Sequence, residues 1–538
     1  MLRAYTAAQV RSTEEPVLAE AGGALMERAA FALAVAVLRE LRARRGRVRG
    51  SHAVLLVGAG NNGGDALHAG AHLARRGVSV LAVTTTARAH PAGLAALLRA
   101  GGRVVSVAEG GPGEPCWLGD AVAEAFTADV VLDALVGIGG NGALRGPAGR
   151  LVAVLSDLIC LEEYGSPFVV AVDVPSGIGV DDGTVSGPVL PACLTVTFGA
   201  PKPGLLLPPA RELAGRVQVV DIGLTPGLVR HGEPAVTCLE DADVVALWPV
   251  PGTHDDKYSR GVLGVVAGGE RFPGAAVLAT SAAVRAGVGM VRYLGPQSAM
   301  DAVLAARPEV VSAGGRVQAW LLGPGVDPAE REQAERIGLA FASALGESPV
   351  PAVVDAGALE LLPAACAPHF VLTPHAGELA RLLTARGQPA KRAEVVAEPM
   401  RFVQLASRLT GATVLLKGST TVIAGPDGTV HAQRGGPPWL ATAGAGDVLA
   451  GVIGALLAGH GPRVVEEPGL AGRLAAAAVL VHGRAAQRAS SRGASSRGAP
   501  DRLGVPDRLG AALGPIAALD VAEALPATIA ALLAGPAR

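Results

Sequence analysis

Four polar residues in the first half of the chain follow apolar segments typical of buried strands. They are Asn62, Asp133, Asp173 and Ser176, and they come from three separate predicted strand ends. Amide, carboxylate and hydroxyl oxygens of this kind bind hard cations or hydrogen-bond polar substrate groups, and a positioned carboxylate can move a proton. In open parallel sheets, ligands bind beyond the carboxyl ends of the strands. The four side chains are therefore predicted to face one crevice.

The first of these strand ends reads LLVGAGNNGGDAL over residues 55–67. A strand that runs through glycines into a helix presents backbone N–H groups and the helix dipole to an anion. Gly58, Gly60 and Gly63 satisfy G-x-G-x-x-G, which favours a dinucleotide-binding site, but such a site requires an acidic residue about 20 positions later. No Asp or Glu occurs between positions 65 and 109. The Asn-Asn pair suits a cation or a polar substrate, or else it only stabilises a turn and caps the helix.

The second half of the chain has a comparable segment, ATAGAGDVL, at residues 441–449. Small residues ahead of a helix expose consecutive N–H groups, which can hold a phosphate during its transfer. Asp447 stands where it could accept a proton from an attacking hydroxyl. Taken alone, Gly-x-Gly-Asp is equally compatible with an ordinary helix N-cap.

Further strand ends accompany this segment. LLKGSTTVI places Lys417 and Gly418 after a strand, where they suit nucleotide phosphates, and LTPHAGEL places His375 after another. A single histidine after a strand is as readily structural as it is a substrate contact. The remaining segments of this group are DKYSRG (256–261), AGVGM (286–290), LGPGV (322–326) and VVDAGAL (353–359).

Two series of apolar strands alternating with helical stretches position these residues. Such alternation predicts α/β domains with parallel sheets covered by helices on both faces. In the first series we expect helices over 6–41 and 65–76 and strands at 53–57, 78–83, 130–132, 169–172 and 217–220. In the second we expect strands at 262–267, 320–322, 352–354, 370–372 and 413–416.

At 538 residues the chain is too long for one hydrophobic core, so two or three domains are expected. We predict a first domain over 1–228, a proline-rich junction over 229–250, and a second domain over 251–538. A low-complexity insertion at 487–512 contains Ser-Ser-Arg-Gly runs and a repeated Pro-Asp-Arg-Leu-Gly, and no function is assigned to it.

Composition excludes several classes of protein. Half of the residues are hydrophobic, 17% are charged, and the formal net charge is −1, so no global field attracts nucleic acid or an acidic membrane. The five cysteines are scattered without a Cys-x-x-Cys pair, which argues against a disulfide framework. The longest early apolar run, 29–38, is too short to span a bilayer. We expect a cytoplasmic homo-oligomer with neither nucleic acid nor membrane as a partner.

The segments GAGNNGGD, DALVGIG, DVPSGI and FGAPKPGL together resemble the signature of the NAD(P)H-hydrate epimerase family, over residues 1–228. The resemblance implies a Rossmann-like, doubly wound sheet, and potassium held by Asn62, Asp133 and Ser176. Asp173 is the candidate for the proton shuttle, through either ring opening or water exchange. The residues implied to hold the hydrated nucleotide are Asn61, Asn62, Gly63, Gly64, Asp65, Gly137, Ile138, Gly139, Gly140, Asn141, Gly142, Ala143 and Asp173.

The second group of segments resembles the ADP/ATP-dependent NAD(P)H-hydrate dehydratase family, over residues 240–538. This implies a ribokinase-like domain in which Asp447 is the base and magnesium accompanies ADP or ATP. The implied substrate contacts are Ala275, Gly325, His375 and Asp447. The implied nucleotide contacts are Lys417, Gly418, Ser419, Thr420, Thr421, Gly444 and Gly446.

The two resemblances together predict an enzyme that epimerises the R and S hydrates and then dehydrates the S hydrate, with release of phosphate. One alternative is a ribokinase-like small-molecule kinase, such as a vitamin-precursor kinase, fused to an unrelated domain. Another makes the first half a nucleotide-sensing or partner-binding module without activity. The choices between ADP and ATP, and between NADH and NADPH hydrates, stay open.

Overall fold

The computed structural model describes residues 1–21, 23–140, 142–161, 165–491 and 514–535. The described chain divides into two compact units. The first comprises Arg3–Ala235, and the second comprises Met1–Leu2 and the described chain from Val236 onward. The stretch predicted as a junction contains regular structure: α8 (Thr225–Arg230), β10 (Val236–Cys238) and α9 (Asp241–Leu247).

The sheet of the first unit is entirely parallel, with strand order β5-β4-β3-β2-β6-β7-β8-β9. Its order reverses at β2, because the chain first runs outward through β3 and β4 and then returns to β6 on the other side. Where the order reverses, the loops that follow the two neighbouring strands run in opposite directions and leave a crevice between them. The strands are β2 (His52–Val57), β3 (Ser79–Thr84), β4 (Arg103–Ser106), β5 (Glu114–Pro115), β6 (Val130–Ala134), β7 (Phe168–Val172), β8 (Leu194–Phe198) and β9 (Arg216–Val220).

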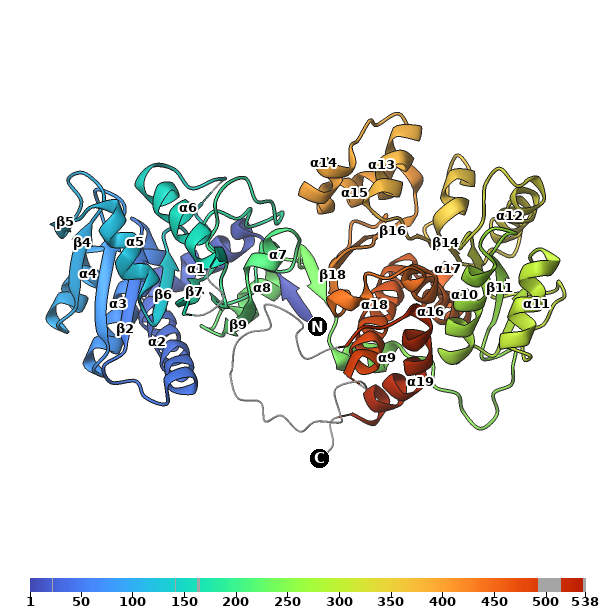
Figure 1. Ribbon diagram of the computed structural model, residues 1–538, viewed down its shortest axis with the longest axis horizontal. Helices are drawn as coiled ribbons and strands as arrows, with labels where there is room; N and C mark the ends of the chain where they lie inside the picture. Colours follow the sequence, from blue (N-terminus) through green and yellow to red (C-terminus); the bar gives the residue numbers. More distant parts are fainter. Residues whose placement is uncertain (22, 141, 162–164, 492–513, 536–538) are drawn as a thin grey trace. The chain divides into compact units, whose positions relative to one another are not determined.

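Helices cover both faces of this sheet (Figure 1). Successive residues of β2 enter opposite cores: Leu55 packs with α2, α3 and α4, whereas Val54 and Leu56 pack with α5 and α6. The predicted α/β class with a parallel sheet is thereby confirmed for this unit. The helices are α1 (Ala7–Ala21), α2 (Ala24–Arg45), α3 (Asn61–Arg75), α4 (Pro91–Arg99), α5 (Leu118–Phe126), α6 (Gly146–Leu161), α7 (Ala210–Leu213) and the 3₁₀ helix η1 (Pro203–Leu205).

One predicted boundary was wrong. We expected the helix after the first glycine loop to begin at Asp65, but α3 begins at Asn61, with Gly60 as its N-cap. The two asparagines therefore lie in the first helical turn rather than in a free loop. The glycines that suggested a loop are tolerated because the turn packs closely against the end of β2: a Cβ at Gly63 would lie 2.4 Å from the carbonyl oxygen of Gly58.

The second unit has a mixed sheet in the order β10-β18-β17-β16-β15-β14-β13-β11-β12. The strands from β12 to β16 pair in parallel, while β17 pairs antiparallel with both β16 and β18. The bounds are β11 (Val262–Val266), β12 (Met290–Tyr293), β13 (Ala319–Leu322), β14 (Ala352–Val354), β15 (Phe370–Leu372), β16 (Thr413–Leu416), β17 (Thr420–Ala424) and β18 (Val430–Arg434), and β1 (Leu2–Ala4) opens the chain.

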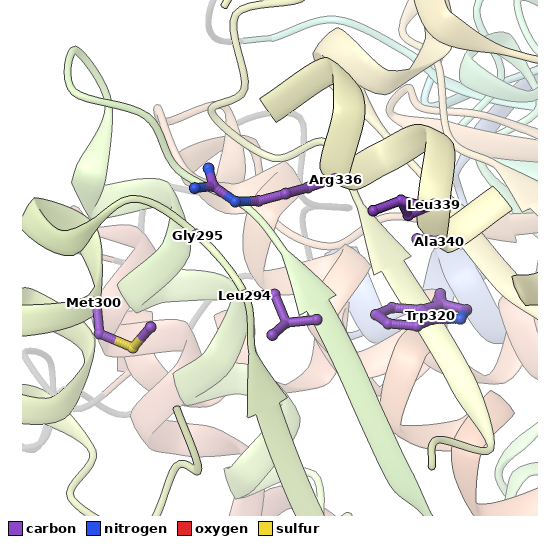
Figure 2. Close-up of a pocket in the computed structure, with 7 residues that line it drawn as sticks. All are labelled: Leu294, Gly295, Met300, Trp320, Arg336, Leu339 and Ala340. Carbon is purple, nitrogen blue, oxygen red and sulfur yellow. The ribbon is translucent and has the colours of Figure 1, made fainter. Parts of the chain in front are cut away.

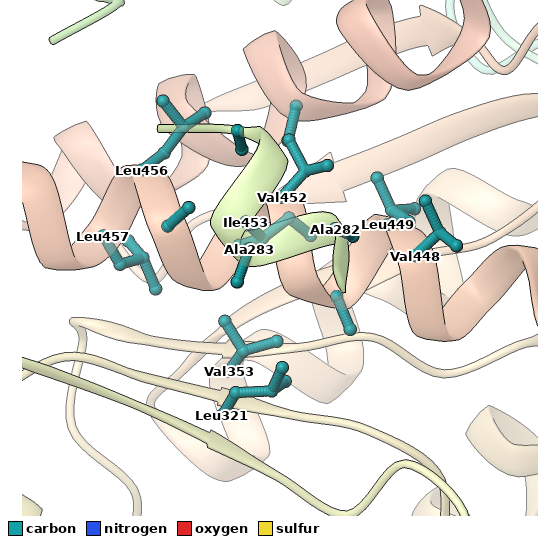
Figure 3. Close-up of a cluster of buried hydrophobic side chains, with 14 of the residues drawn as sticks. Ala282, Ala283, Leu321, Val353, Val448, Leu449, Val452, Ile453, Leu456 and Leu457 are labelled. Atoms are coloured by element: carbon teal, nitrogen blue, oxygen red, sulfur yellow. The ribbon is translucent and has the colours of Figure 1, made fainter. Parts of the chain in front are cut away.

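A buried helix, α16 (Ala445–His460), forms the centre of this unit's core. Figure 3 shows its apolar side chains between α10 (Pro273–Arg285) and the strand residues Leu321 and Val353. Close approach of the two helices requires a glycine, because a Cβ at Gly451 would lie 2.3 Å from the carbonyl oxygen of Ala279. Because of where α16 lies and the direction in which it runs, its N-terminal turn, which contains Asp447, lies beyond the strand ends.

The other helices of the second unit lie on both sides of its sheet. On the face away from α16, the rings of Phe341 and Phe370 stack with centroids 6.1 Å apart. None of the described helices is long and apolar enough to cross a membrane. The helices are α11 (Gln297–Ala306), α12 (Arg331–Ala344), η2 (Ala356–Leu361), α13 (Ala376–Ala385), α14 (Arg392–Ala397), α15 (Pro399–Thr410), η3 (Pro438–Leu440), α17 (Pro462–Glu466), α18 (Pro468–Ser491) and α19 (Ala518–Ala534).

Two candidate active sites

The crevice of the first unit opens where β2 and β6 lie side by side. Leu56 pairs with Asp133 in the parallel register, so both strands end at the same level. The chain leaving β2 passes so close to the chain leaving β6 that a Cβ at Gly58 would lie 1.8 Å from the carbonyl oxygen of Leu135. The glycine signature thus has a packing cause, which weakens its interpretation as a dinucleotide-binding fingerprint.

Asp133 and Ser176 form one hydrogen-bonded network beneath this crevice. The backbone N–H of Ser176 donates to Asp133 Oδ2 over 2.8 Å, and the Ser176 hydroxyl contacts both the N–H and the carbonyl of Val136, at 3.0 and 3.2 Å. Asp133 is fully buried, and burial raises the pKa of its carboxyl. Among the residues that the structure describes, no cation forms an ion pair with it.

Asn62 completes this cluster from the first turn of α3. Its side chain lies directly against Gly137, where a Cβ would meet the amide carbon at 3.1 Å, and Gly137 is the neighbour of Val136. The amide nitrogen of Asn62 is buried and has no hydrogen-bond partner within the described chain. A buried carboxylate without a cationic partner, beside amide, hydroxyl and carbonyl oxygens, is a donor set that fits a hard cation such as potassium.

Asp173 stands at the end of β7 in a backbone conformation that L-residues rarely adopt, with φ 67°. Its Oδ1 accepts hydrogen bonds from the Thr197 hydroxyl at 3.0 Å and the Phe198 N–H at 3.3 Å, and from the ammonium of Lys202. Lys202 is only 1% exposed. Asp173 is therefore held firmly on one side of its carboxylate.

Two further carboxyl groups approach this pair. Burial raises the pKa of Asp65, on α3, well above its usual range, and the negative charges of Asp173 and Glu14 raise it further. Burial also raises the pKa of Glu14, on α1, while Lys202 opposes that shift. Burial thus favours the acid forms of Asp65 and Glu14 beside Asp173.

The predicted substrate loop after β6 is described except for one residue. The carbonyl of Ile138 accepts a hydrogen bond of 2.6 Å from Arg11 of α1. At Gly187, a Cβ would lie 2.7 Å from that of Ala143, so the far end of the loop packs on the chain after β7. Asn141 lies outside the described residues.

The second site forms around the N-terminal turn of α16. Gly444 adopts φ 86° as the N-cap, and Asp447 follows in the first turn. Burial raises the pKa of Asp447 to about 7, the negative charge of Asp355 adds to the shift, and Lys417 opposes it. A carboxyl group with a pKa near the working pH suits a general base.

Lys417 links the strand ends of this site. Its Nζ donates to Asp355 Oδ1 over 2.7 Å and lies 3.4 Å from the position that a Cβ of Gly446 would occupy. Burial lowers the pKa of Lys417, but the charges of Asp355, Glu378 and Asp447 outweigh this effect and raise it. A lysine charge therefore stands beside the predicted phosphate-binding turn.

His375 caps α13 next to this lysine. Its Nδ1 accepts from the N–H groups of Gly377 and Glu378 at 3.0 and 3.3 Å, so the proton of a neutral ring is on Nε2. His375 and Lys417 occupy a bridge between adjacent strand ends, and the His375 side chain is 55% exposed. The structural role that the sequence left open is present: His375 caps α13, and its Nε2 lies 3.4 Å from Glu378 Oε1.

Two glycines connect the remaining predicted residues. A Cβ at Gly325 would lie 2.5 Å from the Cβ of Ala275 in the first turn of α10, and one at Gly444 would lie 2.4 Å from Leu278, one turn later. The structure thus brings Ala275, Gly325 and Gly444 together along α10. The backbone of Gly435 donates to the carbonyl of Ser419 over 2.9 Å, which places the loop before η3 on the predicted nucleotide segment.

Sequence comparisons assign both units. Residues 22–204 match the sequence model described as YjeF-related protein N-terminus, and residues 263–503 match that of NAD(P)H-hydrate dehydratase. The bifunctional NAD(P)H-hydrate repair enzyme Nnr of Mycobacterium tuberculosis is 45% identical over 473 residues, which cover 84% of this chain and 89% of that protein. The chain belongs to the family of bifunctional NAD(P)H-hydrate repair enzymes. Both family resemblances seen in the sequence are confirmed.

Further relatives match single units of this repair-enzyme chain. The NAD(P)H-hydrate epimerase of Clavibacter michiganensis is 46% identical over 225 residues, covering 41% of this chain and 90% of that protein. The crystal structure of the ADP/ATP-dependent NAD(P)H-hydrate dehydratase from Bacillus subtilis, co-crystallised with ATP and Mg²⁺, is 24% identical and covers 55% of this chain and 97% of that one, with a TM-score of 0.42.

Within the predicted nucleotide segment of this repair-enzyme chain, the residues differ in accessibility. Gly418 and Ser419 are exposed in the turn after β16, whereas Thr420 and Thr421 lie in β17 and are 7% and 3% exposed.

The sequence did not single out Asp355 or Glu14, and it noted Lys202 only within a motif. Two signals were present: lysine occurs only four times in the chain, and Asp355 directly follows the predicted strand 352–354.

A cavity of about 350 Å³ lies elsewhere in the dehydratase unit, between α11 and α12 (Figure 2). None of the predicted site residues lines it, and Arg336 is its only charged lining residue. It therefore belongs to neither candidate site. The lining residues are Leu294, Gly295, Met300, Trp320, Arg336, Leu339 and Ala340.

Proposed function

We propose that this chain repairs hydrated NADH and NADPH. The first unit interconverts the R and S hydrates, and the second converts the S hydrate back to the dinucleotide with ADP or ATP and releases phosphate. The observation that carries the proposal is the 45% identity to a bifunctional repair enzyme, because the match extends over 84% of the chain. Fusion serves the chemistry: one unit supplies the epimer that the other consumes.

The epimerisation needs a base. Water adds to an enamine double bond so that the hydroxyl sits on the carbon attached to nitrogen. Asp173 takes the hydroxyl proton, the carbon–nitrogen bond breaks as the carbonyl forms, and the ring nitrogen receives the proton. Rotation of the aldehyde and closure on its opposite face reverse these steps and give the other epimer. If Asp173→Asn keeps the full epimerisation rate, Asp173 is not the base.

Asn62, Asp133 and Ser176 would hold potassium in the first unit. Their fit rests on the buried Asp133 carboxylate and the oxygen-rich surroundings described above. When bound, the ion would supply a fixed positive charge that favours an anionic substrate group. Asn61, Gly63, Gly64, Asp65 and the loop from Gly137 to Ala143 would surround the hydrated nucleotide.

The dehydration starts with phosphoryl transfer in the second unit. The hydrate oxygen attacks the terminal phosphorus, its proton passes to Asp447, and the nucleotide leaves. The carbon–oxygen bond then breaks, because phosphate is a far better leaving group than hydroxide. The electron pair of the ring nitrogen assists this step, and loss of a proton from the neighbouring carbon restores the double bond.

The turn before α16 and the end of β16 would bind the phosphates. The backbone at Gly444 and Gly446 stabilises the charge of the transferring group, and the segment from Lys417 to Thr421 binds the nucleotide. The described residues contain no cluster of three or more His, Cys, Asp or Glu that could enclose a metal. Magnesium would therefore arrive with the nucleotide and depend on phosphate oxygens for most of its ligands.

The decisive experiment supplies the purified protein with both NADPH-hydrate epimers, ADP or ATP, magnesium and potassium. Absorbance of the dihydronicotinamide reports the product. Recovery of both epimers, faster than they interconvert unaided, supports both activities. Recovery of one epimer leaves only the dehydratase, and a stable phosphorylated product indicates a small-molecule kinase instead. The oligomeric state is a separate prediction, which light scattering would check.

A further inference from the structure

Lys202 is the most completely enclosed charged side chain near Asp173. It follows β8 and is 1% exposed. Its ammonium donates to Asp173 Oδ1, to the Thr197 hydroxyl over 3.0 Å and to the Phe198 carbonyl over 3.1 Å. An ammonium group has three N–H bonds, so these three acceptors satisfy it. Lys202 consequently has no donor left for a substrate.

The two oxygens of Asp173 differ in their surroundings. Oδ1 receives three hydrogen bonds, from Lys202, the Thr197 hydroxyl and the Phe198 N–H. Oδ2 makes none with any residue that the structure describes. The Asp173 side chain is 11% exposed. One oxygen is thus saturated by the protein, while the other is available for a ligand.

Stability alone does not account for this pair. A buried ion pair contributes little net stability, because removing both charges from water costs about as much as their attraction returns. Asp173 also pays a backbone cost at φ 67°. Strain and buried charge concentrated at one residue are typical of functional sites.

We propose that Lys202 is a positioning residue for epimerisation: it anchors Oδ1 of Asp173 and leaves Oδ2 as the oxygen that moves the proton. The inference rests on the proposed function of the first unit. During ring opening Oδ2 takes the hydroxyl proton and passes it to the ring nitrogen, and after rotation of the aldehyde the proton returns to the oxygen by the same route during closure. Lys202 itself neither gains nor loses a proton.

The charged groups around Asp173 and Lys202 determine how epimerisation is expected to depend on pH. Glu14 from α1 and Asp65 from α3 are the other titratable groups that interact with Asp173, and Lys202 is the cation among them. Without Lys202, the Asp173 carboxylate would stand among two acidic groups, with Arg11, which acts on Glu14, as the cation that remains. Because Lys202 lowers the pKa of both Glu14 and Asp65, its removal would favour the acid forms of these carboxyl groups beside Asp173.

The test compares Lys202→Met, Lys202→Arg and Thr197→Val in the full chain. Epimerisation is measured as kcat and KM over pH 5–9 with potassium present, and dehydration of the pure S hydrate by the same samples reports folding of the remainder. Lys391→Met removes an exposed lysine as a matched control. We expect Lys202→Met to lower kcat on the order of 10²-fold, to leave KM within about threefold, and to move the acid limb of the profile to higher pH.

The other variants keep the inference testable if Lys202→Met does not fold. Lys202→Arg should recover part of the rate and most of the pH profile, because it restores the charge. Thr197→Val should lower kcat by about tenfold without moving the limb, because it removes the hydrogen bonds of the Thr197 hydroxyl with Asp173 and Lys202 but no charge. If Asp173→Asn is inactive while Lys202→Met keeps the wild-type rate and pH profile, the inference about Lys202 is wrong and the proposed function still stands. If the wild-type protein does not epimerise the hydrates, the proposed function fails first.

Discussion

The ammonium of Lys417 lies between two elements of the dehydratase site, 2.7 Å from Asp355 Oδ1 and beside Gly446 in the first turn of α16. Asp355 follows β14 and is 2% exposed, so a buried carboxylate holds the Lys417 ammonium in place. Asp355 and Lys417 affect the carboxyl of Asp447 in opposite directions. The ends of β14 and β16 and the start of α16 therefore bring three interacting charges together. Mutation of each of these three residues should affect the site in a different way.

Asp447→Asn should abolish dehydration and spare epimerisation. Loss of a positioned general base lowers kcat by about 10²–10⁴-fold, and the base lies in the second unit only. The measurement is recovery of NADPH from the S hydrate, with epimer interconversion in the same sample as the control. Equal loss of both activities in a folded variant would contradict separate sites.

The dehydration rate should rise with pH through the neutral range. Burial raises the pKa of Asp447 to about 7, and a base acts only when deprotonated, so kcat/KM should increase as the pH passes from 6 to 8. Measurement with the S hydrate under saturating nucleotide and magnesium would show this. A flat profile over that range would remove Asp447 from the role of base.

Asp355→Asn should move the same limb to lower pH. Asp355 raises the pKa of Asp447, and its removal also leaves the opposing charge of Lys417 unpaired, so both effects lower that pKa. Glu360→Gln, which removes an exposed charge from the adjoining η2, serves as the matched control and should leave the profile in place. A shift toward higher pH in Asp355→Asn would show that Lys417 has left the site.

Potassium should activate epimerisation through Asp133. We expect replacement of potassium by choline at constant ionic strength to slow epimerisation by about tenfold or more, and Asp133→Asn to remove the dependence on potassium. The loss of the buried negative charge also changes stability, so thermal unfolding of the variant is the companion measurement. A wild-type rate that ignores potassium would contradict the assignment of the cluster.

Gly451→Ala should destabilise the second unit. The added Cβ would lie 2.3 Å from the Ala279 carbonyl, so α10 and α16 must separate at a cost of about 1–3 kcal/mol. Gly338→Ala is the matched control, because its Cβ meets nothing within 4 Å in α12, and the helix should gain about 0.5–1 kcal/mol. Differential scanning calorimetry of the two variants compares the effects directly.

Even short strands with mostly apolar sequences were predictable from the sequence, whereas a longer strand with two buried polar side chains was not. The predicted 352–354, 370–372 and 413–416 coincide with β14, β15 and β16. The strand β8 was missed because its two buried threonines, Thr195 and Thr197, interrupt the apolar run. Thr195 is tolerated because its hydroxyl donates to the carbonyl of Ala214, a partner 19 residues away that no local pattern reveals.

The start of α3 was misplaced for a related reason. Asn-Asn-Gly-Gly has low helix propensity and indicates a loop, yet the segment is helical from Asn61. Close packing against the end of β2 and the approach of Gly137 to the Asn62 side chain outweigh that propensity. Tertiary contacts of this kind are absent from any window of sequence.

The sequence by itself determined the α/β class, the family and the residues at the ends of the strands, because strand periodicity and glycine spacing are local properties. Only the tertiary structure decided which charges meet. Lys202 lies 29 residues from Asp173, and Lys417 lies 62 residues from Asp355. Parallel strands bring such residues together at one edge of the sheet, and the low dielectric there makes each charge depend on its partner.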